Sequence, residues 1–213
     1  MVCIMLVDWI RFGTETERLS KTTTITFIVQ FFNSAFLMTM ASANLSEQPL
    51  DFGLTGGTFP DFNAMWFRSV GDILVGSMIF NVYYPIIEVG MYWGLRVLFR
   101  CIDRGCTLNG RTRSTSIQGY INLYEGPVYF MHFKYSSILT IVYITFLYGF
   151  GMPVLFPIAV CSFCVLYLVE KFMLFYGYVV PPMYDERLSN SVLDKLQAAP
   201  LLYLAFGYWT ASS

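Results

Sequence analysis

The chain has 213 residues, of which 56% are hydrophobic, 18% aromatic and only 13% charged, and its formal net charge is -1. Soluble domains carry about 25% charged residues, so this composition excludes an ordinary soluble domain and favours a membrane protein. A net charge near zero gives no basic surface for nucleic acid, and no nucleic-acid partner is expected. The sequence therefore predicts an all-α, polytopic transmembrane helical bundle that forms one membrane domain over residues 1–213.

The first two predicted spans cover residues 24–43 and 67–99. The first lies in a stretch of 25 uncharged residues that ends before Glu47. About 20 apolar residues are enough for one helix to cross the hydrocarbon core. The second span is apolar enough between its charged positions to cross with some tilt. Those positions include Asp72, Glu88 and Arg96.

Residues 135–169 contain no charged side chain over 35 positions. A single helix of that length would extend about 50 Å, well beyond the roughly 30 Å of hydrocarbon in a bilayer. The glycines around residue 150 and Pro153 favour a turn there. The sequence therefore predicts two spans, residues 127–150 and 155–178, and Pro127 is expected in the first helical turn of the earlier one.

A fifth span is predicted at residues 197–213, after the polar segment 184–196 leaves the membrane. Arginine positions give the orientation, because cytoplasmic loops are enriched in Lys and Arg. Residues 96–113 carry five arginines, whereas 45–66 carry no basic residue, so residues 96–113 are expected in the cytoplasm. Every Lys and Arg then lies on or near the inner side except Arg68. A multi-pass protein of the plasma membrane is expected.

Polar side chains inside the predicted spans are the candidate pore-lining residues. Gln30 and Asn33 share a helix face in the first span, and Asn81 and Glu88 share one in the second. A water-filled cation path would stabilise the ionised form of Glu88. One alternative stays open, in which the three amides hold helices together by hydrogen bonds of about 0.6 kcal/mol each and Glu88 lies near the inner interface and pairs with an arginine such as Arg96.

Glycines and a proline on the second span are the candidate gating hinge. Gly71, Gly76, Pro85 and Gly90 weaken the hydrogen-bond ladder of the helix, which would allow it to bend on opening. Gly90 and Gly94 also form a GxxxG pair, whose commoner use is close packing of two helices. Both interpretations are retained.

The sequence lacks the residues of an enzyme active site. His132 is the only histidine, and no serine, histidine and aspartate set or paired carboxylates are found, so no catalytic residue is predicted. Cys161 and Cys164 have metal-ligand spacing but lie in an apolar span without a second ligand pair, and Cys101 and Cys106 are equally incomplete. Neither a metal site nor a cofactor is expected.

Several proline and aromatic patterns occur in an order that resembles a known family. The matching stretches are residues 18–33, Tyr124-Glu125-Gly126-Pro127 through Tyr143, Gly151-Met152-Pro153-Val154-Leu155-Phe156-Pro157, Tyr167-Leu168-Val169-Glu170-Lys171, Phe175-Tyr176-Gly177-Tyr178 and Ala198-Ala199-Pro200-Leu201-Leu202. Together they extend over most of the chain. The family is the OSCA family of hyperosmolality-gated, calcium-permeable, stress-gated cation channels, which are distant relatives of the anoctamins.

The resemblance implies an ion path within one subunit, with the helix at residues 67–99 contributing to the gate. It also implies a homodimer of the full-length protein and a large cytoplasmic domain ahead of this portion. The chain would then be an incomplete core whose residues 1–12 are the tail of another pore helix. The family's acidic residue on this helix would fall near Phe80, where this chain has none, so Asn81 and Glu88 are its candidate replacements.

From these features we expect the pore-region portion of an osmotically or mechanically gated, calcium-permeable cation channel. Its expected partners are membrane lipid and the permeating cations. Two alternatives are kept. One is a lipid scramblase of the same superfamily, and the other is a non-conducting structural membrane subunit.

Overall fold

The computed structural model of the chain describes residues 14–42, 59, 64–106, 112–179 and 186–212. Of these residues 84% are helical, and none lies in a β-strand, so the fold class is all-α. The predicted helix tail at residues 1–12 lies outside the described residues. Contacts divide the chain into two compact units. The first comprises Met1–Phe80, Phe130–Val160 and Tyr184–Ser213, and the second comprises Asn81–Tyr129 and Cys161–Met183.

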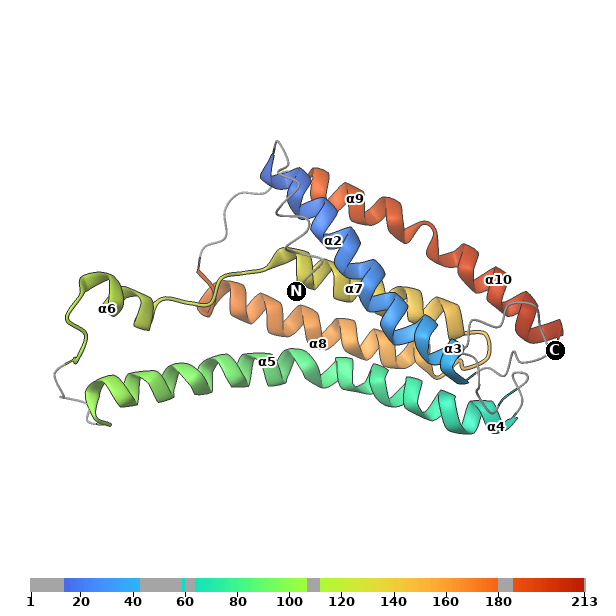
Figure 1. Cartoon of the computed structure of the whole chain (residues 1–213), viewed down its shortest axis with the longest axis horizontal. Coiled ribbons are helices and arrows are strands. Elements are labelled where there is room, and N and C mark those ends of the chain that lie inside the picture. Colours follow the sequence, from blue (N-terminus) through green and yellow to red (C-terminus); the bar gives the residue numbers. More distant parts are fainter. Residues whose placement is uncertain (1–13, 43–58, 60–63, 107–111, 180–185, 213) are drawn as a thin grey trace. The chain divides into compact units, whose positions relative to one another are not determined.

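The first long helix consists of α2 (Glu15–Phe31), a π-helical turn η1 (Phe32–Phe36) and α3 (Leu37–Ser42) (Figure 1). The side chain of Thr14 caps its start by accepting a hydrogen bond of 3.3 Å from the backbone N–H of Glu17. Such a cap satisfies one of the N–H groups that have no partner in the first turn. The helix therefore begins well before the predicted span and includes it almost completely.

The second long helix consists of α4 (Ala64–Trp66), a π-helical turn η2 (Phe67–Gly71) and α5 (Asp72–Arg104). It stops because Gly105 and Cys106 adopt left-handed φ values of 65° and 58°. The N–H of Cys106 donates a 2.8 Å hydrogen bond to the carbonyl of Cys101, which closes the helix end. The helix thus continues past the predicted boundary at residue 99.

The remaining helices are shorter or follow turns. They are α6 (Ile117–Tyr124), α7 (Met131–Tyr148), α8 (Leu155–Tyr176), α9 (Arg187–Leu196) and α10 (Ala199–Ser212). The chain leaves the helical conformation between α7 and α8, in the segment where glycine and Pro153 predict a turn.

Three of the described helices are long and apolar enough to cross a membrane, namely Thr16–Met40, Ala64–Arg104 and Leu155–Tyr176. These are consistent with a multi-pass membrane protein. Helix α7 has 18 residues and α10 has 14, and neither meets the same criteria of length and composition. The count of five spans stays a prediction.

The predicted position of Pro127 in a helical turn is wrong. Residues 125–130 are not helical, and α7 begins only at Met131. The carbonyl of Pro127 instead accepts a hydrogen bond of 3.2 Å from the N–H of Val179, just after α8. A Cβ on Gly126 would lie 2.3 Å from the carbonyl oxygen of Gly177, so only glycine permits this approach. The contact between Pro127 and Val179, which are far apart in sequence, therefore explains why α7 begins after the predicted position.

In the first unit, α7 packs against α2, α9 and α10. Its buried core contains Phe27, Leu139, Tyr143, Val192 and Ala199. The rings of Phe27 and Tyr143 meet edge to face at 4.7 Å, and the Tyr143 hydroxyl donates a 2.6 Å hydrogen bond to the carbonyl of Lys195. Helix α7 is therefore covered mainly by protein.

The burial of α7 explains its polar composition. Ser136, Thr140 and Thr145 are buried, and each hydroxyl donates to a carbonyl of the preceding turn over 2.7 to 2.9 Å. Hydroxyl groups satisfied by their own helix can be buried at little cost.

The second unit contains the later parts of α5 and α8 together with α6. The rings of Trp93 and Phe172 lie 6.1 Å apart. The end of α5 is tied to the chain that follows it, because Asp103 accepts hydrogen bonds from the Thr112 hydroxyl (2.6 Å) and the Arg113 N–H (3.1 Å). These bonds fix the region from which α6 starts.

Candidate functional site

The two candidate residues of the first long helix have different surroundings. Gln30 is half-buried, and its Oε1 lies 3.4 Å from the hydroxyl of Thr140 on α7. Asn33 lies in the π-helical turn η1 and is exposed. The contact of Gln30 with Thr140 agrees with a polar link between two helices, whereas the side chain of Asn33 is exposed.

The two candidates on α5 are both half-buried, and Pro85 between them is buried. Proline has no N–H, so position 85 cannot donate the helical hydrogen bond to the carbonyl of residue 81. Asn81 therefore brings both a side-chain amide and a backbone carbonyl to an interrupted part of the ladder. Glu88 lies seven residues further on, which places it on the same side of the helix.

Gln30 and Asn33 belong to the first compact unit, and Asn81 and Glu88 belong to the second. Each pair is described within its own unit. That all four residues line one pore stays a prediction.

The predicted hinge glycines occupy two kinds of surroundings. Gly71 is buried, and a Cβ there would lie 2.9 Å from the sulfur of Met152, which permits close packing of the α7–α8 turn on the helix. A Cβ on Gly76, Gly90 or Gly94 would meet no atom within 4 Å. The GxxxG pair thus has no close contact with the described part of this chain, and its glycines are free of packing constraints.

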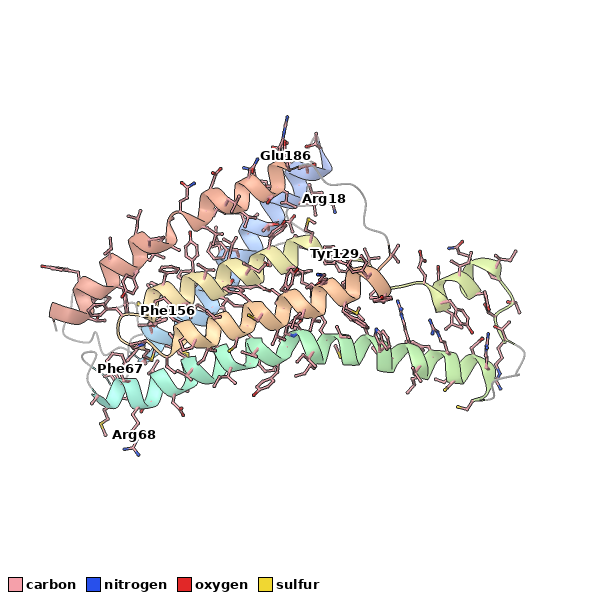
Figure 2. All side chains as sticks on the ribbon, turned by 180° about the vertical axis from the view of Figure 1, so that it is seen from behind. Arg18, Phe67, Arg68, Tyr129, Phe156 and Glu186 are labelled. Atoms are coloured by element: carbon pink, nitrogen blue, oxygen red, sulfur yellow. The ribbon has the colours of Figure 1, made fainter. Side chains whose placement is uncertain are left out.

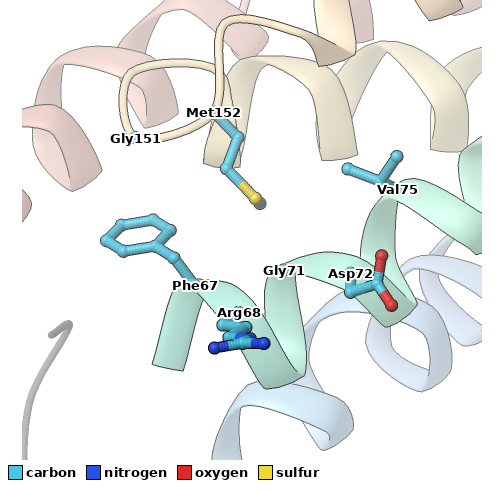
Figure 3. Close-up of a pocket in the computed structure, with 7 residues that line it drawn as sticks. All are labelled: Phe67, Arg68, Gly71, Asp72, Val75, Gly151 and Met152. Carbon is cyan, nitrogen blue, oxygen red and sulfur yellow. The ribbon is translucent and has the colours of Figure 1, made fainter. Parts of the chain in front are cut away.

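A pocket of about 550 Å³, which the sequence did not predict, lies beside the π-helical turn η2. Its lining residues are Phe67, Arg68, Gly71, Asp72, Val75, Gly151 and Met152 (Figure 3). The first five come from the start of the second long helix, and the last two come from the turn between α7 and α8. An open pocket with one cation, one anion and apolar walls suits a small zwitterionic group.

The two charged residues of this pocket are both exposed. The Arg68 side chain extends away from the helix (Figure 2). No ion pair in the described part of the chain joins Arg68 to Asp72. Two sequence signals could have drawn attention to this place: Arg68 is the exception to the predicted inner location of basic residues, and Asp72 follows it by four positions.

Aromatic packing next to η2 supports the residues that line the pocket. Trp66 is buried, and its ring lies 5.1 Å from that of Phe67 and 6.3 Å from that of Tyr148. The Tyr148 hydroxyl donates a 3.0 Å hydrogen bond to the carbonyl of Ala35, inside η1, and also contacts the hydroxyl of Thr39. Both π-helical turns are thus linked through α7, and such turns are common at functional sites.

No metal site was found in the described part of the chain, where no three His, Cys, Asp or Glu side chains lie close enough to hold an ion. Cys101, Cys106, Cys161 and Cys164 are free thiols.

Comparison of the chain with models of protein families, with curated proteins and with solved structures found no match. The class defined by fold and composition is therefore an all-α protein with helices able to span a membrane.

Proposed function

We propose that this chain is the pore-region portion of an osmotically or mechanically gated, calcium-permeable cation channel. In this proposal the chain crosses the plasma membrane five times and acts as a homodimer of the full-length protein. One observation carries the proposal: Asn81 and Glu88 are half-buried on either side of Pro85, within a helix long and apolar enough to cross a bilayer. The resemblance of the sequence to stress-gated channels supports it.

The physical argument concerns the environment of Glu88. A carboxylate within hydrocarbon is costly, and such residues commonly border water or another polar group. A wet path beside α5 would hydrate Glu88 and let a cation approach Asn81 at the same time. Calcium prefers oxygen ligands from carboxylates, amides and backbone carbonyls, and all three occur in this part of the helix.

Gating would use the flexibility of α5. Pro85 removes one hydrogen bond of the ladder, and Gly76 and Gly90 have open space around them. Membrane tension favours the conformation that occupies more area in the bilayer. A bend at Pro85 would convert a change of area into a change of pore width.

Recording from the full-length protein in liposomes under stretch tests the proposal. Glu88→Gln should lower the permeability of calcium relative to potassium by at least about tenfold, because the charge that concentrates the divalent ion is lost. Asn81→Ala should change ion preference in the same direction. Ile87→Ala is the control, since Ile87 is exposed beside Glu88. Unchanged conductance and ion preference in both variants would remove these residues from the path.

A lipid scramblase is the second candidate, and the pocket at η2 favours it. Arg68 could bind the phosphate of a zwitterionic headgroup while Asp72 binds its ammonium group, with Phe67 and Met152 against the glycerol. A fluorescent-lipid flip assay on the same liposomes separates the two candidates. Flipping that is lost in the double variant Arg68→Gln, Asp72→Asn, while stretch currents persist, would assign the pocket to lipid.

A non-conducting membrane subunit is the third candidate. The contact of Gln30 with Thr140 favours it, because an amide fixed between two helices acts as a structural link. In such a subunit Asn33, Asn81 and Glu88 would also be sealed from water.

A further inference from the structure

Three arginines form a row near the end of α5. Arg96, Arg100 and Arg104 follow one another at intervals of four residues, which places them on one face of the helix. Like charges at this spacing repel by a few tenths of a kcal/mol per pair, and a bound anion would relieve this repulsion. The row lies in the second compact unit, at the helix end expected on the cytoplasmic side.

Two of these arginines are held by backbone oxygens rather than by carboxylates. Arg96 Nη2 donates to the carbonyl of Glu125 over 2.6 Å, and Arg100 Nη2 to the carbonyl of Tyr124 over 3.4 Å. Neither makes an ion pair with a carboxylate of the described residues. Each guanidinium has five N–H donors, and these two hydrogen bonds use one donor of Arg96 and one of Arg100. The oxygens of the nearby Asp103 accept hydrogen bonds from the Thr112 hydroxyl and the Arg113 N–H.

The ring of Tyr124 positions the row and joins it to α6. The guanidinium carbons of Arg100 and Arg104 lie 4.7 and 5.5 Å from the centre of this ring. Cations over an aromatic face are attracted by its electrons, and the planar contact orients the guanidinium groups. Tyr124 is also the last residue of α6, so the arginine row and α6 form one continuous surface.

Helix α6 is an exposed amphipathic helix. None of its residues is buried, and Ile117 and Ile121 are 83% and 46% exposed. With Tyr120 and Tyr124 they follow the 3.6-residue period on one face, whereas Gln118 and Asn122 lie on the other and share a 3.2 Å hydrogen bond. Apolar side chains on one face and amides on the opposite face are typical of a helix that lies in the membrane interface.

We infer that the arginine row of α5 and the apolar face of α6 together form a binding site for an anionic phospholipid of the inner leaflet. Arg96 and Arg100 bind the phosphate and the headgroup carboxylate, and the acyl chains cover Ile117 and Ile121. Three positive charges within about two helical turns match the negative surface of that leaflet. The site requires that the chain lie in a membrane with residues 96–113 on the cytoplasmic side, and it does not depend on conduction.

Native mass spectrometry of the detergent-solubilised chain, titrated separately with phosphatidylserine and phosphatidylcholine, tests the site. Phosphatidylserine should bind more tightly. Arg96→Gln and Arg100→Gln should each weaken its binding by about fivefold, the effect expected for loss of one basic residue at an anionic surface. Binding of phosphatidylcholine should not change. Equal affinity of the wild-type chain for the two lipids would overturn the inference.

Two further variants distinguish a specific binding site from general attraction of the anionic lipid to positive charge. Lys171→Gln removes a charge of the same unit from a lysine that contacts Tyr167, and it should leave phosphatidylserine affinity unchanged. Arg100→Lys keeps the charge but loses the planar group, and it should weaken binding. Loss of affinity in Lys171→Gln as large as in Arg100→Gln would contradict the site.

A soluble headgroup distinguishes lipid from free phosphate compounds. Glycerophosphoserine carries the same charges without acyl chains, so it should compete far more weakly than phosphatidylserine. Competition at the affinity of the lipid would show that α6 adds nothing and would overturn the lipid assignment.

Discussion

The hydroxyl of Tyr148 donates a 3.0 Å hydrogen bond to the backbone carbonyl of Ala35, joining the end of α7 to the π-helical turn η1. Both residues are buried. A π-helical turn spaces its backbone hydrogen bonds differently from an α-helix, and an external donor can stabilise its carbonyls. Tyr148 therefore fixes an irregular turn of the first long helix at a defined place.

Replacing Tyr148 by phenylalanine should destabilise the first unit. The variant removes the O–H that donates to the buried carbonyl of Ala35, to which the Thr39 hydroxyl also donates over 3.0 Å, so we expect the free energy of unfolding to fall by about 1 kcal/mol. Reversible unfolding in mixed detergent micelles measures it. Tyr208→Phe is the control, because Tyr208 is 80% exposed and should change stability by less than about 0.5 kcal/mol. Equal effects of the two substitutions would contradict the structural role of Tyr148.

Alanine substitutions at two glycines of the second unit should act in opposite directions. Gly126→Ala places a Cβ 2.3 Å from the Gly177 carbonyl oxygen and should destabilise by about 1–3 kcal/mol. Gly90→Ala meets open space within a helix and should stabilise by up to about 1 kcal/mol. The free energy of unfolding of both variants, measured in the same way, tests the close contact at Gly126 and the open space at Gly90.

Gly90→Ala also tests the proposed hinge. If α5 bends near this glycine on opening, a stiffer helix should raise the membrane tension needed for half-maximal current. Patch recordings of the full-length protein compare this variant with Gly94→Ala, since Gly94 lies in the same helix outside the proposed hinge and a Cβ there would also meet no atom within 4 Å. A tension threshold that stays unchanged in Gly90→Ala would argue against a hinge at this position.

Burial of Lys195, with a smaller contribution from Lys21, lowers the pKa of its ammonium group, although Asp194 acts in the opposite direction. A lysine whose pKa is lower in the folded state binds fewer protons there than in the unfolded state. Stability should therefore rise with pH as the pH increases from the folded pKa toward the ordinary value of lysine. The variant Lys195→Met should lose this rise. Chemical unfolding of both proteins at several alkaline pH values checks the difference, and identical pH profiles would contradict it.

The sequence predicts several helix positions well because their signals are local. The interruption at Pro153 separates two apolar runs, and α8 follows the expected segment closely, ending at Tyr176 instead of residue 178. The first long helix begins at the cap of Thr14, the second ends at the left-handed residues after Arg104, and both extend beyond their apolar stretches. Apolar length alone does not locate such ends.

Other features depend on contacts between distant parts of the chain. Pro127 is suited to a helix start, but its carbonyl pairs with the N–H of Val179 and residues 125–130 are not helical. The pocket forms because the turn at Met152 packs on Gly71, and neither residue alone indicates a cavity. Gln30 was predicted as a polar residue of a spanning helix, but its partner Thr140 is 110 positions away.

The central claim is that the polar residues of α5 border water inside the membrane, and thiol labelling tests it most directly. In the full-length protein, the five cysteines of this portion are replaced by serine, and single cysteines are introduced at Asn81, Ile87 and Glu88. A membrane-impermeant thiol reagent should then modify positions 81 and 88 under stretch and leave position 87 unmodified. Protection of positions 81 and 88 under stretch, or equal labelling at all three positions, would contradict the account.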